Sequence, residues 1–270
     1  MAVITRHPAV AGRFYPDDRN TLLKDVLEYF PTRTTTAPAC GCVAPHAGYM
    51  YSGAVAGAVY GQLTIPQRIV ILGPNHTGKG RPLAIMSHDA WETPLGQVPV
   101  DTPLADALKK EFPLLTEDAD AHRSEHAIEV ELPFLQVLRP DFTFVPIALG
   151  TGQFEILHKL GEAIAQVVQA QTDKILIVAS SDMNHYENDP VTRIKDHKAI
   201  EQILALDPRG LFDVVMREDI SMCGFGPAVT MLTATKRLGA TSAELVKYAT
   251  SGDVSGDRDM VVGYAGIVVR

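Results

Sequence analysis

Residues 68–78 read RIVILGPNHTG, an apolar run that breaks into a turn of small residues and delivers His76. Two further segments repeat this pattern, CVAPHAGYMYSG at 42–53 and KILIVASSDMNHY at 174–186. Short β-rich runs followed by Gly, Pro, Asn or Ser are typical of strands in an open α/β sheet, where site residues follow the carboxyl ends of parallel strands. The histidines of all three segments are therefore expected at one edge of a sheet.

Strands and helices are expected to alternate along the chain. Further strands are predicted at 142–149 and in the closing segments LVKYAT and MVVGYAGIVV, and a hairpin or meander with a Pro-Leu-Gly turn is predicted within 83–100. Apolar periodicity predicts helices at 17–30, 53–63, 103–112, 124–138, 153–170, 195–205 and 227–238. This alternation predicts an α/β protein, a single α/β/α layered domain over residues 1–270 with a central, mostly parallel or mixed sheet.

The composition excludes several classes of protein. Hydrophobic residues make up 46% of the 270 residues, which is ample for a sizeable core. A net charge of −8 argues against a nucleic-acid partner or an anionic membrane surface. No apolar run approaches the roughly 20 residues that span a bilayer, no signal peptide is visible, and three cysteines do not form a disulfide framework. A cytoplasmic protein is expected.

His46 and His76 are candidate metal ligands because each follows a predicted buried strand among Gly and Pro residues, which keep a turn tight. The alternative is a tight turn whose histidine bonds a neighbouring carbonyl. Cys223, in MCGFGP at 222–227, precedes a predicted helix start near Pro227. The helix dipole there would lower the pKa of the thiol and favour the metal-binding thiolate. The alternative is a buried, unreactive core cysteine.

The segment SSDMNHY at 180–186 offers a second kind of chemistry. Asp182 lies three residues before His185, so it can orient the imidazole or share a proton with it. The competing interpretation is that Ser and Asp after a strand cap a new helix.

Two acidic residues and a histidine in SEHAIEVELPFL are also candidates. Glu125 and Glu129 are spaced i, i+4, so they would share one face of the predicted helix, with His126 beside them. A solvated acidic face and a site role for Glu125 or His126 both fit this spacing.

Taken in order, eight blocks of this chain resemble the Memo family, also described as protein B of the AmmeMemoRadiSam system. The blocks are AGRFYP, APHAGYMYSG, ILGPNHTG, TPLGQVPVD, EHAIEVELPFLQ, SSDMNHY, CGFGP and VGYAGI, and they cover nearly the whole chain. The family is similar in fold to class III extradiol dioxygenases, which hold non-haem Fe(II) with two histidines and one carboxylate.

The resemblance implies site residues and partners. It matches His46 and His76 to the two histidine ligands, Cys223 to the position of the dioxygenase carboxylate, and His185 to the acid/base histidine. Three protein ligands would leave open positions for a substrate. A thiolate in place of a carboxylate softens the site, so Cu or Zn fits as well as Fe(II), and its oxidisability argues against ring cleavage. The resemblance also implies radical-SAM and AMMECR-type pathway partners.

Three functions fit these residues. The first is a metal-dependent redox enzyme with iron or copper on His46, His76 and Cys223, acting on a small molecule or peptide. In it His185 would move protons, Asp182 would orient His185, and Tyr49, Glu125 and His126 would contact substrate. The second is a non-catalytic module that binds a peptide or small ligand in the same pocket. The third is a zinc hydrolase with a metal-bound water as nucleophile.

Overall fold

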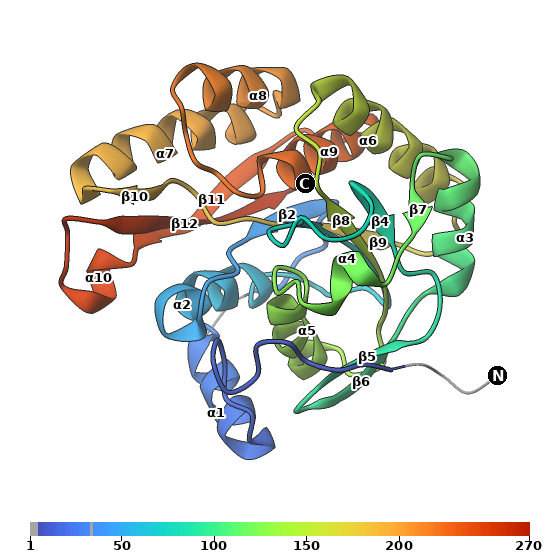
Figure 1. Ribbon diagram of the computed structural model, residues 1–270, viewed down its shortest axis with the longest axis horizontal. Coiled ribbons are helices and arrows are strands. Elements are labelled where there is room, and N and C mark those ends of the chain that lie inside the picture. The colour runs from blue at the N-terminus through green and yellow to red at the C-terminus, as the bar shows by residue number, and fades with distance from the viewer. Residues whose placement is uncertain (1–4, 33–34) are drawn as a thin grey trace.

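A computed structural model describes residues 5–32 and 35–270 and shows a layered α/β fold around one large mixed sheet (Figure 1). The strand order is β10–β12–β2–β9–β3–β8–β4–β7, and β11 also pairs with β12. These strands are β2 (Gly41–Ala44), β3 (Arg68–Pro74), β4 (Leu83–Ile85), β7 (Thr116–Glu117), β8 (Thr143–Leu149), β9 (Ile175–Ser180), β10 (His185–Glu187), β11 (Ala243–Thr250) and β12 (Val261–Val269).

The centre of this sheet is parallel and its flanks are antiparallel. Neighbours β2, β9, β3 and β8 run parallel, while β12 pairs antiparallel with β2 and β4 pairs antiparallel with β8. The predicted α/β class with a mixed sheet is confirmed. Because the four central strands run in one direction, their carboxyl ends meet at one edge.

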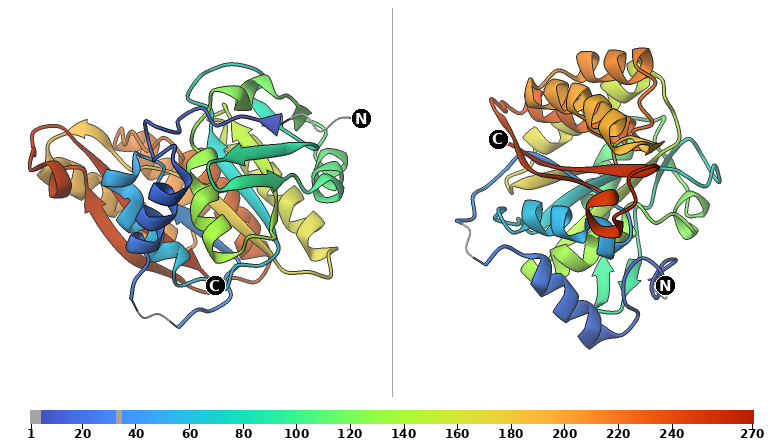
Figure 2. Two further views of the ribbon diagram at one scale, coloured as in Figure 1. Left: turned by 90° about the horizontal axis from the view of Figure 1, so that it is seen from below. Right: turned by 90° about the vertical axis from the view of Figure 1, so that its left-hand side faces the viewer.

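Helices cover both faces of the sheet, as the side view in Figure 2 shows. Alternate residues of the central strands divide between two buried clusters: Val70 and Leu72 of β3 pack on one face, Ile69 and Ile71 on the other. This alternation is what the period-2 geometry of a strand dictates when both faces are covered. The helices are α1 (Arg19–Tyr29), α2 (Tyr49–Tyr60), α3 (Thr102–Glu111), α4 (Asp120–Arg123), α5 (Leu132–Leu138), α6 (Phe154–Gln169), α7 (Asp189–Leu204), α8 (Pro208–Arg217), α9 (Phe225–Arg237) and α10 (Gly252–Ser255).

The single helix predicted over 124–138 is wrong. Helix α4 ends at Arg123, a turn follows, and the 3-10 helix η1 (Glu129–Glu131) leads into α5. The carboxylate of Glu125 accepts the backbone N–H groups of His126 and Ala127 and also that of His76, 49 residues away, and these contacts together hold the chain in a turn. Glu125 and Glu129 therefore share no helix face, and both are buried rather than solvated.

Other boundaries also differ from expectation. Helix α2 starts at Tyr49 instead of 53, and α7 starts at Asp189 instead of 195 because Asn188 caps it through the N–H of Val191. Helix α8, capped by Asp207, was not predicted. No helix starts within SSDMNHY, so the capping interpretation of Asp182 is wrong.

A small second sheet joins β1 (Thr5–Arg6), β5 (Ala90–Thr93) and β6 (Gly96–Pro99). The antiparallel pairing of β5 with β6 confirms the predicted hairpin, whose turn uses Gly96 at a φ of 130°. Among the helices of the described residues, none combines the length and the apolar character that a membrane crossing requires.

Candidate metal centre

Three polar side chains leave the carboxyl edge of the sheet at equivalent positions. His46 lies two residues beyond β2, His76 two residues beyond β3, and Asp182 two residues beyond β9. Because β9 lies between β2 and β3, the parallel register places the Asp182 loop between the two histidines. The fold thus assembles the site from segments far apart in the sequence.

His46 is held by one hydrogen bond to its imidazole ring and one to its backbone N–H. Its Nδ1 lies 2.7 Å from Ser180 Oγ, and its backbone N–H donates to Asp182 Oδ1 at 2.8 Å. Burial lowers the pKa of His46 to about 3, and nearby His76 adds to this effect. The ring is therefore neutral, as a metal ligand must be, and Nε2 is the atom left to face a ligand.

His76 is held in the same way by a different carboxyl group. Its Nδ1 lies 2.9 Å from Glu125 Oε1, and its backbone N–H donates to Glu125 Oε2 at 2.6 Å. Burial opposes charge on His76, but the Glu125 hydrogen bond and charge outweigh burial and raise the pKa of His76. Although burial acts the other way, the His76 contacts lower the pKa of Glu125 to about 2. Such carboxylate–imidazole pairs fix the ring and leave Nε2 free for a metal.

Cys223 reaches these histidines from the start of α9. Its Sγ lies 3.2 Å from His46 Nε2. Gly224 permits this approach, because a Cβ there would lie 2.4 Å from the Ser180 carbonyl oxygen. Burial, and then the charge of Asp182, raise the pKa of the Cys223 thiol well above its usual value. The expectation that the helix N-terminus would lower this pKa is wrong, because burial dominates.

The structure brings His46, His76 and Cys223 together. One ligand atom from each lies within 4.8 Å of the others, the arrangement that a single metal ion requires. His76, Glu125 and His126 form a second group at the same spacing. In that group, however, Glu125 already accepts three backbone N–H groups and the His76 imidazole. The first group, in which Cys223 Sγ lies 3.2 Å from His46 Nε2, is the better candidate for a metal site.

A pocket of about 280 Å³ opens beside these donors. Within it, His185 is fixed by the Ser221 carbonyl, which lies 2.9 Å from Nδ1 and accepts its proton, so Nε2 is the ring nitrogen left for the pocket. The hydrogen bond of Asp182 goes to His46, so it is Ser221 that orients the His185 ring. The lining residues are Phe14, His46, Ala47, Gly48, His76, His126, Asp182, His185, Tyr186, Val262 and Tyr264.

The three predicted substrate contacts lie in different places. His126 lines the pocket, with its ring stacked on His76 at a centroid distance of 4.7 Å, and burial lowers the pKa of His126 to about 4. Glu125 is buried behind His76 and acts on the pocket through that ring. Tyr49 is 3% exposed, and its hydroxyl donates to the Val130 carbonyl at 2.6 Å. Of the three, only His126 faces the pocket described above.

Sequence reasoning gave no role to several residues of the site. Phe14 packs its ring 4.7 Å from that of His126, and Tyr264 forms part of the wall. Ser180 and Glu131 lie behind His46. Phe14 and Glu131 fall inside the blocks AGRFYP and EHAIEVELPFLQ, which was the available signal, but local pattern alone does not show where their side chains go.

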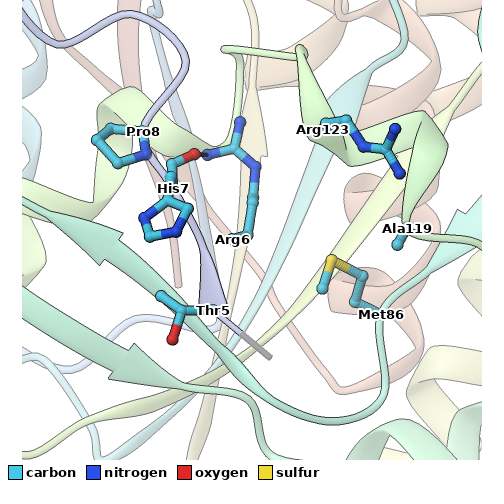
Figure 3. Close-up of a pocket in the computed structure, with 7 residues that line it drawn as sticks. All are labelled: Thr5, Arg6, His7, Pro8, Met86, Ala119 and Arg123. Atoms are coloured by element: carbon cyan, nitrogen blue, oxygen red, sulfur yellow. Dashed lines mark hydrogen bonds between the residues drawn. The ribbon is translucent and has the colours of Figure 1, made fainter. Parts of the chain in front are cut away.

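A second hollow, of about 390 Å³, lies where the N-terminal strand meets α4 (Figure 3). The Arg6 guanidinium in it is committed to protein partners, donating to the His7 carbonyl and to Glu129. Its lining does not bring together the metal-ligating groups found at the sheet edge. The lining residues are Thr5, Arg6, His7, Pro8, Met86, Ala119 and Arg123.

Comparison with known proteins agrees with this architecture. A family model described as "Memo-like protein" matches residues 6–268. A MEMO1 family protein of Methanopyrus kandleri is 45% identical over 98% of this chain and 99% of its own, and one of Methanosarcina barkeri is 45% identical over 98% and 100%. The crystal structure of an uncharacterized Escherichia coli K12 protein superposes with a TM-score of 0.53 at 14% identity, covering 83% of this chain and 98% of that chain, which shows similarity of fold.

Proposed function

This chain belongs to the family of Memo-like proteins. On that premise we propose that the pocket at the carboxyl edge of the sheet holds one redox-active metal ion and that the protein acts there on a small molecule or a peptide. His46, His76 and Cys223 would hold the ion. The observation that carries this proposal is that a ring nitrogen of His46, a ring nitrogen of His76 and Cys223 Sγ lie within 4.8 Å of one another, while both Nδ1 atoms have protein partners.

The donor set fits such an ion. With the ion bound, the two imidazoles would be neutral and Cys223 would be a thiolate, a three-ligand set of the kind that leaves coordination positions open. When bound, iron or copper would supply the one-electron chemistry that lets an organic substrate react with O₂. The thiolate is a soft ligand, so copper or zinc competes with iron for the same atoms.

The residues around the donors supply the rest of the chemistry. His185, with Nδ1 directed at the Ser221 carbonyl, presents the lone pair of Nε2 to the pocket and is placed to accept a proton from a bound substrate. Phe14 and Tyr264 form apolar walls that limit the access of water. His126, stacked on His76, offers a second imidazole to polar groups of the substrate.

Metal content tests the proposal. The protein is purified without air or chelator and analysed by mass spectrometry as wild type, His46→Ala and Cys223→Ser. The matched controls are His197→Ala, at an exposed histidine, and Cys40→Ser, at a half-buried cysteine outside the site. We expect near-stoichiometric iron or copper in wild type and controls, and its loss from both site variants.

Two other results would change the assignment. Zinc that is present in wild type and lost from His46→Ala and Cys223→Ser would favour a zinc hydrolase, whose cleavage reaction does not need oxygen. A wild-type protein that is empty and cannot be loaded with any of these metals would contradict the proposal and favour a non-catalytic ligand-binding module.

A further inference from the structure

Ser180 lies at the centre of a buried hydrogen-bond network behind the metal centre. Its Oγ is 2.7 Å from His46 Nδ1, 2.7 Å from the Ala127 carbonyl oxygen and 2.8 Å from Glu131 Oε1. Ser180 and Glu131 are both 0% exposed. Each of these three contacts therefore requires its own proton, since a buried polar pair without one is costly.

The number of available protons determines which group donates in each of the three Ser180 contacts. The Ser180 hydroxyl has one proton, and the Ala127 carbonyl has none, so the serine must donate to Ala127. The two remaining contacts then need protons from their other members, His46 Nδ1 and Glu131 Oε1. In this arrangement the serine oxygen donates once and accepts twice, which is its full capacity.

The surroundings of Glu131 suit a neutral acid. Among its described contacts, Tyr60 Oη donates to Oε2 at 2.8 Å, and Oε1 is left for Ser180. Burial raises the pKa of Glu131 to about 8, although its contacts with Ser180 and Tyr60 act the other way, and the charge of Asp182 adds to the rise.

Glu129, two residues earlier, shows the opposite arrangement. Its oxygens accept from the Arg6 guanidinium, the Tyr15 hydroxyl and the backbone N–H groups of Ala9 and Val10. Every one of these partners is a donor and one is a cation, so the hydrogen bonds around this equally buried group favour its carboxylate form. The same short segment thus holds two buried carboxyl groups with opposite surroundings.

We propose that Glu131 is a protonated carboxylic acid that acts through Ser180 to fix the tautomer of His46, with the imidazole proton on Nδ1. Glu131 is thus a positioning residue for the metal centre. The consequence for metal binding rests on the proposed function. The tautomer directs the Nε2 lone pair toward Cys223 Sγ, 3.2 Å away, and so toward the place of the ion.

Infrared spectroscopy of the metal-free protein at neutral pH tests the protonation state. Wild type should show a C=O stretch of a neutral carboxylic acid that is missing from Glu131→Gln, and the difference between the two spectra cancels any contribution of Asp182 and Asp196, whose pKa values burial also raises. Glu129→Gln is the matched control and should leave that band in place. Nitrogen-15 spectra of the imidazoles should show His46 protonated at Nδ1, with this preference weakened in Ser180→Ala.

Metal affinity, measured with Zn²⁺ as a redox-inert probe, tests the positioning role. Glu131→Gln should bind Zn²⁺ within about threefold of wild type, because the amide donates to Ser180 and accepts from Tyr60, while Glu131→Leu and Ser180→Ala should bind at least about tenfold more weakly. A wild-type spectrum without the acid band, or His46 protonated at Nε2, would overturn the inference even if metal binds. A protein that shows the band and tautomer but binds no metal would instead refute the proposed function.

Discussion

At the scale of single residues, the site is built by side chains that hold other side chains. Ser180 and Glu125 each occupy the Nδ1 of one histidine, so both rings present Nε2. The sequence pattern identified His46 and His76 because strand-end turns are a local feature. Their partners come from distant segments, so the sequence pattern could not show that Ser180 and Glu131 lie behind the His46 ring. The role of the histidines as ligands stays a prediction.

The pH dependence of stability is expected to report on Glu131. Its pKa is raised in the folded protein to about 8, so its contribution to stability is complete below its unfolded pKa of about 4.5 and is lost as the pH rises through 8. Between pH 4.5 and 8, the free energy of unfolding of wild type should fall relative to that of Glu131→Gln, on the order of 1 kcal/mol per pH unit. Urea unfolding of both proteins at several pH values measures the difference.

Other groups near Glu131 must be separated from this effect. The titratable groups that face it are Tyr49 and Tyr60 of α2, Cys42 of β2 and Asp182 beyond β9. All four are present in both proteins, so the difference between wild type and Glu131→Gln isolates the Glu131 carboxyl group. A difference that does not change with pH would show that this carboxyl group is ionised throughout.

At the scale of elements, local pattern predicted the strands and most helices, because buried central strands and amphipathic helices have distinct periods. It failed between 124 and 138, where long-range contacts decide the backbone. Glu125 pairs with His76, 49 residues away, and Glu129 pairs with Arg6, 123 residues away. No window of local sequence contains these partners, so the break in the helix could not be predicted from it.

The start of α9 should tolerate no side chain at Gly224. A Cβ there would collide with the Ser180 carbonyl oxygen and the Ser181 side chain, both at 2.4 Å, so Gly224→Ala must push α9 and Cys223 away from β9. We expect a loss of about 1–3 kcal/mol in the free energy of unfolding and weaker metal binding. Gly226→Ala is the control, since the atom nearest to its Cβ would be a movable Leu157 methyl group at 3.3 Å and the Thr151 carbonyl oxygen would lie at an ordinary contact distance of 3.6 Å. Equal behaviour of the two variants in denaturation and Zn²⁺ titration would refute this view of the turn.

At the scale of the whole molecule, the N-terminal segment is tied to the site region by Arg6. The guanidinium donates to the carbonyls of His122 and Glu125 and to the Glu129 carboxylate, and it lies over the Trp91 ring. One side chain thus connects β1, the β5–β6 hairpin and the turn that carries the partner of His76. Stability and site geometry are expected to be linked through it.

Arg6→Ala should therefore be strongly destabilising. It leaves the Glu129 carboxylate buried without its cation, for which about 3–5 kcal/mol of unfolding free energy is expected to be lost. Arg123→Ala is the control, because that side chain is exposed and its ion pair with Asp120 should contribute about 0.5 kcal/mol or less. Chemical denaturation measures both variants, and a loss below about 1 kcal/mol for Arg6→Ala would contradict the buried-pair account.

The central claim is that His46, His76 and Cys223 bind one metal ion, and the near-ultraviolet absorption spectrum of the Co²⁺-loaded protein tests it most directly. Thiolate coordination to Co²⁺ produces a sulfur-to-metal charge-transfer band. We predict this band in wild type and in Cys40→Ser, and its absence from Cys223→Ser. A wild-type protein that binds Co²⁺ without the band, or a band that persists in Cys223→Ser, would contradict the account.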